Sequence, residues 1–220
     1  MIAKNLIYPD FPKLKTSDTG LLAIELMSEY KVFHLPIINN RHYLGTISEE
    51  DIHNLNNPQE PVGNHKISIT NGYVEEYHHI YDVIKLMSLN KLSTVGVINK
   101  SNIYIGTITI HSIFSKLHTI AAINEPGGII ILELNNNDLY FSEIAQIIES
   151  NDSKILSLYV FPISNSTKIE VTLKINKIDI LPVIQTLLRY NYNIKASYLD
   201  NNNYNDMIDR YNLLLKYLNI

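Results

Sequence analysis

Residues 33–51 read FHLPIINNRHYLGTISEED, and residues 93–112 read STVGVINKSNIYIGTITIHS. Each copy has an apolar strand, a polar turn, a second strand with the Gly-Thr-Ile motif, and the start of a helix. With Gly45 aligned to Gly106, the copies lie 61 residues apart, and the second holds one extra residue. A unit this small cannot close its own core, so the duplication predicts two stacked copies with a ligand cleft between them. The residues expected to be buried where their sheets pack are Ile37, Ile47, Val97 and Ile108.

The segments around the duplicated stretch predict the same elements in each copy. An amphipathic helix precedes both copies, and Ser17 or Asp18 is the expected cap of the first, because a short side-chain oxygen satisfies free N–H groups of the first turn. Asn39-Asn40-Arg41 suits the turn between the two strands, since Asn tolerates a positive φ. The expected helices are 16–30, 49–55, 77–89 and 110–118, and the expected strands are 34–38, 43–47, 94–99 and 104–108.

A different unit is expected after Asn124-Glu125-Pro126-Gly127-Gly128, where the composition changes. Its apolar patterns predict the order βαββαβ, the ferredoxin-like split arrangement, and a further amphipathic helix follows over 204–218. The predicted fold class is therefore α+β. The expected strands are 128–134, 155–163, 167–175 and 192–198, and the expected helices are 140–149 and 180–190.

The composition excludes several classes of protein. The formal net charge is −4 and no run of Lys or Arg occurs, so a broad nucleic-acid surface is not expected. The chain has no Cys, which excludes disulfides and thiolate metal sites. Because no apolar stretch is long enough to cross a bilayer and the N-terminus lacks a signal-peptide pattern, we expect a cytoplasmic protein with no membrane partner.

The motifs resemble two known families. Through LLAIELM, LPIIN and YLGTISEEDI in the first copy, and DVIKLM, TVGVIN and YIGTITIHSI in the second, residues 13–118 resemble a CBS-domain pair. Residues 127–199 resemble an ACT domain through their element order and the stretch IAQIIESNDSKILSLYVF. The order CBS–CBS–ACT is similar to the acetoin-utilisation AcuB-like group of small bacterial regulatory proteins. The implied domains are a CBS repeat at 1–60 with an N-terminal lead-in, a second CBS repeat at 61–122, and an ACT-like domain with an extra C-terminal helix at 123–220.

The CBS resemblance implies an adenosine nucleotide in the cleft between the repeats. Residues 45–51, GTISEED, match the family signature Gly-h-Ser/Thr-x-x-Asp with Thr46 inserted. Ser48 at a helix N-terminus can donate to a phosphate beside free backbone N–H groups, and Asp51 can accept from both ribose hydroxyls. The alternative is that Ser48 is an ordinary helix cap and Asp51 an acid of the first turn. Leu35, Pro36 and Ile37 would supply an apolar wall for the purine.

The second copy departs from the signature. Thr109 fills the Ser/Thr position, but Ser112 stands where the Asp is expected, so ribose binding is expected at the first copy instead. No Lys or Arg adjoins either motif in the sequence, which favours AMP, or a related adenosine ligand, over ATP.

Other kinds of site have weaker support in the sequence. The ACT-like loop Asn135-Asn136-Asn137-Asp138 lacks the Gly that lets an amino acid approach in that family, so a polar ligand there and a simple connection both stay open. The His residues form no metal-ligand set, since His78 and His79 diverge on a helix. Neither a nucleophile elbow nor a P-loop occurs, so we expect no enzyme, no metal and no required cofactor.

Two functions remain open from the sequence. The first is a small-molecule-sensing regulatory protein that binds an adenosine-type nucleotide in the CBS cleft, could bind another ligand at the ACT domain, and acts through an unknown partner protein. The second is a ligand-free assembly module that uses its CBS and ACT surfaces to dimerise. Under either function we expect a homodimer, because both families tend to associate. The terminal helix adds an apolar surface formed by Leu213, Leu214, Leu215 and Leu218.

Overall fold

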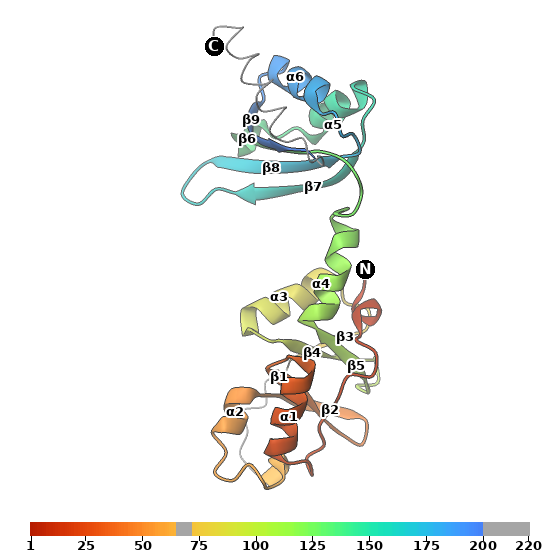
Figure 1. Cartoon of the computed structure of the whole chain (residues 1–220), viewed down its shortest axis with the longest axis vertical. Coiled ribbons are helices and arrows are strands. Elements are labelled where there is room, and N and C mark those ends of the chain that lie inside the picture. The colour runs from red at the N-terminus through yellow and green to blue at the C-terminus, as the bar shows by residue number, and fades with distance from the viewer. Residues whose placement is uncertain (65–71, 200–220) are drawn as a thin grey trace. The chain divides into compact units, whose positions relative to one another are not determined.

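The computed structural model describes residues 1–64 and 72–199. The chain forms two compact units, Met1–Lys116 and Leu117–Ile220 (Figure 1). The division falls inside a helix, several residues before the change of composition at 124–128. The expected helix over 204–218, with its four leucines, lies outside the described residues.

The first repeat consists of α1 (Gly20–Tyr30), β1 (His34–Asn39), β2 (His42–Ser48) and α2 (Glu49–His53). The two strands pair antiparallel, and the turn between them uses positive φ angles of 48° at Asn40 and 71° at Arg41. Asn accepts this conformation readily, which is why the polar turn forms where the sequence predicts it.

The second repeat has the same elements and one more strand. It consists of β3 (Tyr73–Glu75), α3 (Ile80–Asn90), β4 (Thr94–Ile98), β5 (Tyr104–Thr109) and α4 (Ile110–Ile120). The β1–β2 and β4–β5 ladders both shift register at the same place, between Ile37 and Ile38 and between Val97 and Ile98. Strand β3, which pairs parallel to β4, was not predicted.

Helices α1 and α3 both begin later than the sequence predicts. Helix α1 begins at Gly20, and its cap is Thr19, whose hydroxyl accepts from the Leu22 N–H at 3.3 Å. The prediction of Ser17 or Asp18 as the cap is wrong, because the Asp18 carboxylate instead accepts from the Lys15 N–H at 2.7 Å. In the second repeat the cap is His79, and helix α3 follows it.

Each repeat packs against a short segment that precedes the other repeat in the sequence. The helical turn η1 (Ala3–Leu6) packs on the second repeat, where the Ala3 N–H donates to the His78 carbonyl at 2.8 Å. The turn η2 (Val62–Asn64) packs on the first, where the Val62 N–H donates to the Asp18 carbonyl at 2.8 Å. The turn η1 therefore completes the second repeat, although the sequence predicted a lead-in to the first, where Phe11 and Leu14 of the same N-terminal segment do pack.

Each repeat has a core of its own. Ile37 and Ile47 pack with helices α1 and α2, and Val97 and Ile108 pack with helix α3. All four side chains are at most 1% exposed, so their predicted burial is confirmed. They face the helices of their own repeat, however, so other residues form the contact between the two repeats.

Unit 2 is a sheet with two helices on one side (Figure 1). The helices and strands that follow β5 and α4 are β6 (Ile129–Asn135), η3 (Asn136–Asp138), α5 (Phe141–Ser150), β7 (Ile155–Pro162), β8 (Lys168–Ile175), α6 (Leu181–Arg189) and β9 (Asn193–Tyr198). All neighbouring strands are antiparallel, in the order β7-β8-β6-β9. Apolar side chains of α5 and α6, such as Ile144, Ile148 and Leu187, close the core against β6 and β8. Among the described helices, none has both the length and the apolar composition needed to cross a membrane.

Candidate functional site

Ser48 and Asp51 bind each other at the start of helix α2. The Ser48 hydroxyl accepts from the Asp51 N–H at 3.0 Å and donates to Asp51 Oδ2 at 2.7 Å. The same Oδ2 accepts from the Ser48 N–H at 3.0 Å, which completes a capping box. Within the described residues, every hydrogen bond of this carboxylate ends on Oδ2, so Oδ1 is the oxygen that a ligand could use.

The pairing of β1 with β2 decides which side chains lie on the same face as this motif. His34 lies opposite Ser48 and Pro36 lies opposite Thr46, so these four side chains share one face of the ladder. Leu35 and Ile37 alternate to the other face, where they are 0% and 1% exposed in the core. The predicted apolar wall is therefore wrong for the side chains of Leu35 and Ile37, and Pro36 alone remains on the motif's face.

Thr46 holds a tyrosine between the two repeats. Tyr43 donates its hydroxyl proton to the Gly72 carbonyl at 2.8 Å, so the Thr46 hydroxyl, 2.6 Å away, must donate to the tyrosine oxygen. Burial raises the pKa of Tyr43 to about 12. The ring lies against Gly96 of the second repeat, where a Cβ would be 2.6 Å from it. The inserted Thr46 thus has a structural partner, and its hydroxyl proton is not free to donate to a ligand.

The second repeat has an equivalent tyrosine–threonine pair. Tyr104 and Thr107 place their hydroxyl oxygens 2.8 Å apart, as Tyr43 and Thr46 do in the first repeat. The rings of Tyr43 and Tyr104 are stacked, with centroids 6.5 Å apart and planes 10° apart. The two repeats therefore meet through a pair of equivalent tyrosines, which the sequence alone did not indicate.

A histidine also joins the repeats beside the motif. The Ser93 N–H donates to His34 Nδ1 at 3.2 Å, and the Thr94 hydroxyl donates to the His34 carbonyl at 3.0 Å. Because Nδ1 accepts an N–H, the ring is neutral and carries its proton on Nε2. Burial lowers the pKa of His34 from its ordinary value of 6.5, while the nearby Asp51 carboxylate acts in the opposite, smaller sense.

We expect the free energy of unfolding to fall as the pH drops through 6.5, the ordinary pKa of His, because the unfolded chain then binds a proton that folded His34 resists. Urea titrations at pH 7.5 and 5.5 measure this difference. His34→Asn keeps an acceptor for the Ser93 N–H but does not titrate, so its pH dependence should be smaller than that of the wild type. The exposed His42→Asn variant is the matched control and should keep the wild-type dependence. An unchanged dependence in His34→Asn would contradict the prediction.

In the second repeat, the equivalent motif forms its helix-capping hydrogen bonds without a carboxylate. The Thr109 N–H donates to Ser112 Oγ at 2.9 Å, and the Ser112 N–H donates to Thr109 Oγ1 at 3.0 Å. The Ser112 hydroxyl then donates to the Thr109 carbonyl at 2.8 Å. Thr109 is 2% exposed, so its hydroxyl is a helix cap and is not presented to a cleft.

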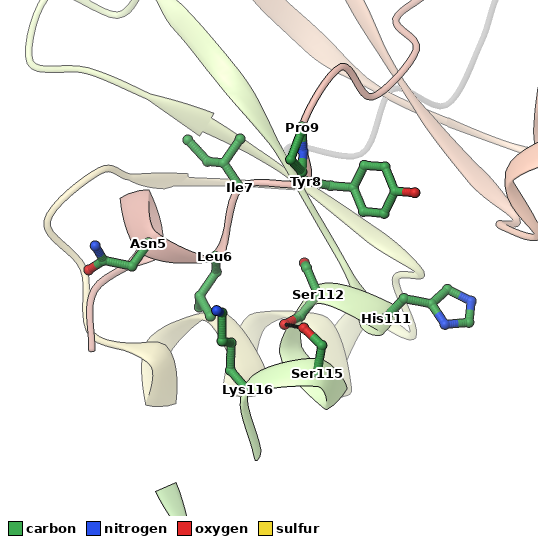
Figure 2. A pocket seen from close by; sticks show the side chains of 9 residues that line it. All are labelled: Asn5, Leu6, Ile7, Tyr8, Pro9, His111, Ser112, Ser115 and Lys116. Carbon is green, nitrogen blue, oxygen red and sulfur yellow. Dashed lines mark hydrogen bonds between the residues drawn. The ribbon is translucent and has the colours of Figure 1, made fainter. Parts of the chain in front are cut away.

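A pocket of about 410 Å³ lies between helix α4 and the N-terminal segment (Figure 2). Ser112, Ser115 and Lys116 of α4 line it on one side, and Ser115 donates to the Ser112 carbonyl at 2.9 Å. Lys116 brings a cation one turn beyond Ser112, and the i, i+4 spacing in the sequence places both residues on one helix face. The other lining residues are Asn5, Leu6, Ile7, Tyr8, Pro9 and His111.

In unit 2 the loop that contains η3 has a hydrogen bond between two of its own side chains. The Asn135 amide donates to Asp138 Oδ2 at 2.9 Å. A pocket of about 420 Å³ adjoins it, in which Lys168 pairs with Glu133 at 2.7 Å and the Tyr192 hydroxyl donates to Glu143 at 2.6 Å. The Lys168 hydrogen bond lowers the pKa of Glu133, and burial, together with the bond to Glu143, raises the pKa of Tyr192.

Over residues 1–64 and 72–199, no group of three or more acidic or His side chains is placed to hold a metal ion.

A known family model matches the first repeat. The CBS domain family model matches residues 3–55, which runs from η1 to the second residue after the end of α2. The second repeat has the same elements as the first. Equivalent residues of the two repeats are 60 positions apart before the turn between the strands and 61 positions apart after it. These findings confirm the mixed α+β fold with CBS domain repeats that the duplicated motif predicts.

Several solved structures are similar to this chain. A CBS domain pair/ACT domain protein from Thermotoga maritima is 22% identical, with a TM-score of 0.48, over 54% of this chain and 98% of that one. The CBS domains of a transcriptional regulator from Streptococcus pneumoniae are 18% identical, with a TM-score of 0.47, over 53% of this chain and 98% of that one. CBSX2 in complex with AMP is 20% identical, with a TM-score of 0.47, over 54% of this chain and 97% of that one.

Proposed function

We propose that this chain is a small-molecule-sensing regulatory protein that binds AMP, or a related adenosine ligand, beside Ser48 and Asp51 and acts through a partner protein. The observation behind the proposal is Asp51, whose Oδ1 has no hydrogen bond within the described residues and lies at the start of α2. Oδ1 can accept from a ribose hydroxyl while Oδ2 keeps the helix capped. The match of residues 3–55 to CBS domains supports the same site.

The surrounding side chains limit the ligand to one of low charge. His34 and Pro36 share the motif's face, and the neutral His34 ring has an Nε2–H to donate. The capping box adds a carboxylate and no cation, so the box itself supplies no positive charge to balance that of a triphosphate. A monophosphate or a nucleoside therefore fits better than ATP. To reach a phosphate, the Ser48 hydroxyl would have to leave Asp51 Oδ2.

The second candidate function is a ligand-free assembly module. Two observations favour it: the capping box is complete without a ligand, and the motif of the second repeat has no carboxylate. In both cases we propose a homodimer of CBS repeats at 1–60 and 61–122 and an ACT-like domain at 123–220. The βαββαβ order and the strand order β7-β8-β6-β9 support a ferredoxin-like arrangement for that domain.

Asp51→Asn should weaken AMP binding by about ten- to a hundredfold, because a charge-assisted bond to ribose contributes about 1.5–3 kcal/mol. Asn can still accept from the Ser48 N–H, so the melting temperature should stay close to that of the wild type. Titration calorimetry with AMP measures the affinity. The matched variant Ser112→Ala should bind almost as tightly as the wild type, because its hydroxyl already donates to the Thr109 carbonyl. Equal losses in both variants, or undiminished binding by Asp51→Asn, would place the ligand elsewhere.

A further inference from the structure

Helices α5 and α6 cover only one face of the unit 2 sheet (Figure 1). Ile130, Leu132, Val171 and Leu173 point to that face and fill the core. Because side chains alternate along each strand, their neighbours point to the other face, which we call the open face. The ladders arrange the open face in rows across β9, β6, β8 and β7. Two of these rows are Tyr198–Ile129–Lys174–Ser157 and Ala196–Ile131–Thr172–Tyr159.

The segment before β6 covers one corner of the open face. The Ser157 hydroxyl donates to the Ala121 carbonyl at 3.0 Å, and the Lys174 ammonium donates to the Ile123 carbonyl at 3.5 Å. These contacts explain why Lys174, a charged residue, is only 9% exposed. The open face therefore already accepts one covering segment of the chain.

Aromatic rings remain exposed over the rest of the open face. Tyr159, Phe161 and Tyr198 are 44%, 57% and 48% exposed. The charged side chains beside them form two ion pairs, Lys168–Glu133 and Lys195–Glu170. Another apolar segment can cover such a surface without burying an unpaired charge.

Residues 204–218 have an apolar stripe that suits this surface. At 3.6 residues per turn, seven apolar side chains of this segment gather within about 120° of the circumference of a helix. They are Tyr204, Met207, Ile208, Tyr211, Leu214, Leu215 and Leu218. Leu213 falls on the opposite side, among Asn, Asp and Lys residues. An amphipathic helix of this kind is stable when its stripe is buried against another element.

The end of β9 leads the chain to the open face. Tyr198 is the last residue of β9 and lies on that face, and Leu199 packs against the core of unit 2. The connection from Leu199 to Tyr204 can span up to about 17 Å, whereas β7 and β9, at the two edges of the sheet, are about 14 Å apart. A helix over 204–218 is about 22 Å long, close to the about 26 Å of the eight-residue strand β7.

We propose that residues 204–218 form a helix that packs its apolar stripe on the open face, over Ile131, Tyr159 and Tyr198. The sheet of unit 2 then lies between two layers of helix, and Leu213 faces outward. The chain's own segment is the occupant, because its tether to β9 gives it an effective concentration at this face that a second copy does not have. The proposal goes beyond the nucleotide site and does not depend on it.

Thiol labelling in the full chain tests this packing. The chain has no cysteine, so Ala196→Cys places a single thiol on the open face. We expect this thiol to react slowly with dithiobis(nitrobenzoate). Adding Leu215→Asp should speed the reaction about tenfold or more, because the carboxylate must leave the sheet to stay hydrated. Adding Leu213→Asp instead, the matched control on the opposite side of the helix, should leave the rate unchanged.

Ser153→Cys separates release of the segment from unfolding of unit 2. Ser153 is 2% exposed, so a thiol at this position reacts only when the unit itself opens. It should stay protected when Leu215→Asp is added. If it does not, the milder Leu215→Ala replaces Leu215→Asp, and the same comparison between positions 196 and 153 decides.

Two results would overturn the proposal. One is a rate at position 196 that neither aspartate changes, or that both aspartates raise equally. The other is protection that grows with protein concentration and survives Leu215→Asp, which would place a second copy on the open face. Calorimetry with AMP is a separate measurement, so the nucleotide site is judged independently of either result.

Discussion

Leu6→Ala should lower the free energy of unfolding of unit 1 by about 2–5 kcal/mol, the usual cost of removing a buried leucine side chain. Leu6 is 1% exposed and packs in the core of the second repeat with Val74, Val83 and Ile108. Its removal therefore leaves a cavity in a repeat whose other elements begin only at β3. Urea unfolding followed by circular dichroism measures the change in free energy. Hydrogen exchange should also show the amides of α3 becoming less protected.

Leu44→Ala is the matched control for this prediction. Leu44 is 38% exposed on strand β2, so its truncation should cost less than about 1 kcal/mol. If Leu6→Ala destabilises the protein no more than Leu44→Ala does, the N-terminal segment does not belong to the core of the second repeat.

Gly127→Ala should destabilise unit 2 by on the order of 3 kcal/mol or more. Gly127 has a φ of +151°, and a Cβ there would lie 1.9 Å from the Ile175 carbonyl oxygen. Because that obstacle is backbone of strand β8, it cannot move aside without disturbing the ladder with β6. Differential scanning calorimetry should show a lower melting temperature for the transition of unit 2.

The neighbouring Gly128→Ala is the control, because it adds the same methyl group one residue away. A Cβ at Gly128 would meet Cγ2 of Ile180, which is side chain and not backbone, and the residue has no positive φ. Its effect should be the smaller of the two. A Gly127→Ala variant as stable as Gly128→Ala would mean that the turn before β6 accommodates a side chain.

Local sequence patterns predicted most helices and strands of this fold. The features that were not predicted depend on contacts between distant segments or on elements too short to show a pattern. The duplicated stretch places β1, β2, β4 and β5, because apolar alternation and the Asn-rich turn are properties of neighbouring residues. Strand β3 has only three residues, too few to show a period. The start of α1 was missed because Thr19, Asp18 and Ser17 are all suitable caps, and only the contact between Asp18 and Lys15 decides among them.

The candidate site was predictable in part for the same reason. Ser48 and Asp51 lie within one helical turn, so their sequence spacing fixes their contact. The contacts of His34 with Ser93 and of Tyr43 with Gly96 join residues from different copies, and neither copy shows a pattern that marks them. Side chains alternate between the two faces of β1, so three consecutive residues cannot line one wall. This is why the prediction for Leu35 and Ile37 was wrong.

The exchanged segments η1 and η2 have a consequence for how unit 1 can be divided. A cut between residues 60 and 61 follows the duplication in the sequence, yet it leaves each half without a piece of its own core: Val62 on one side, and Ala3 and Leu6 on the other. Neither fragment can then close alone, whereas the two fragments together still hold every core residue. We therefore expect the two repeats to unfold as one cooperative unit. In that case a ligand bound at the first repeat would stabilise the second as well by mass action, even if no change of shape carried the signal.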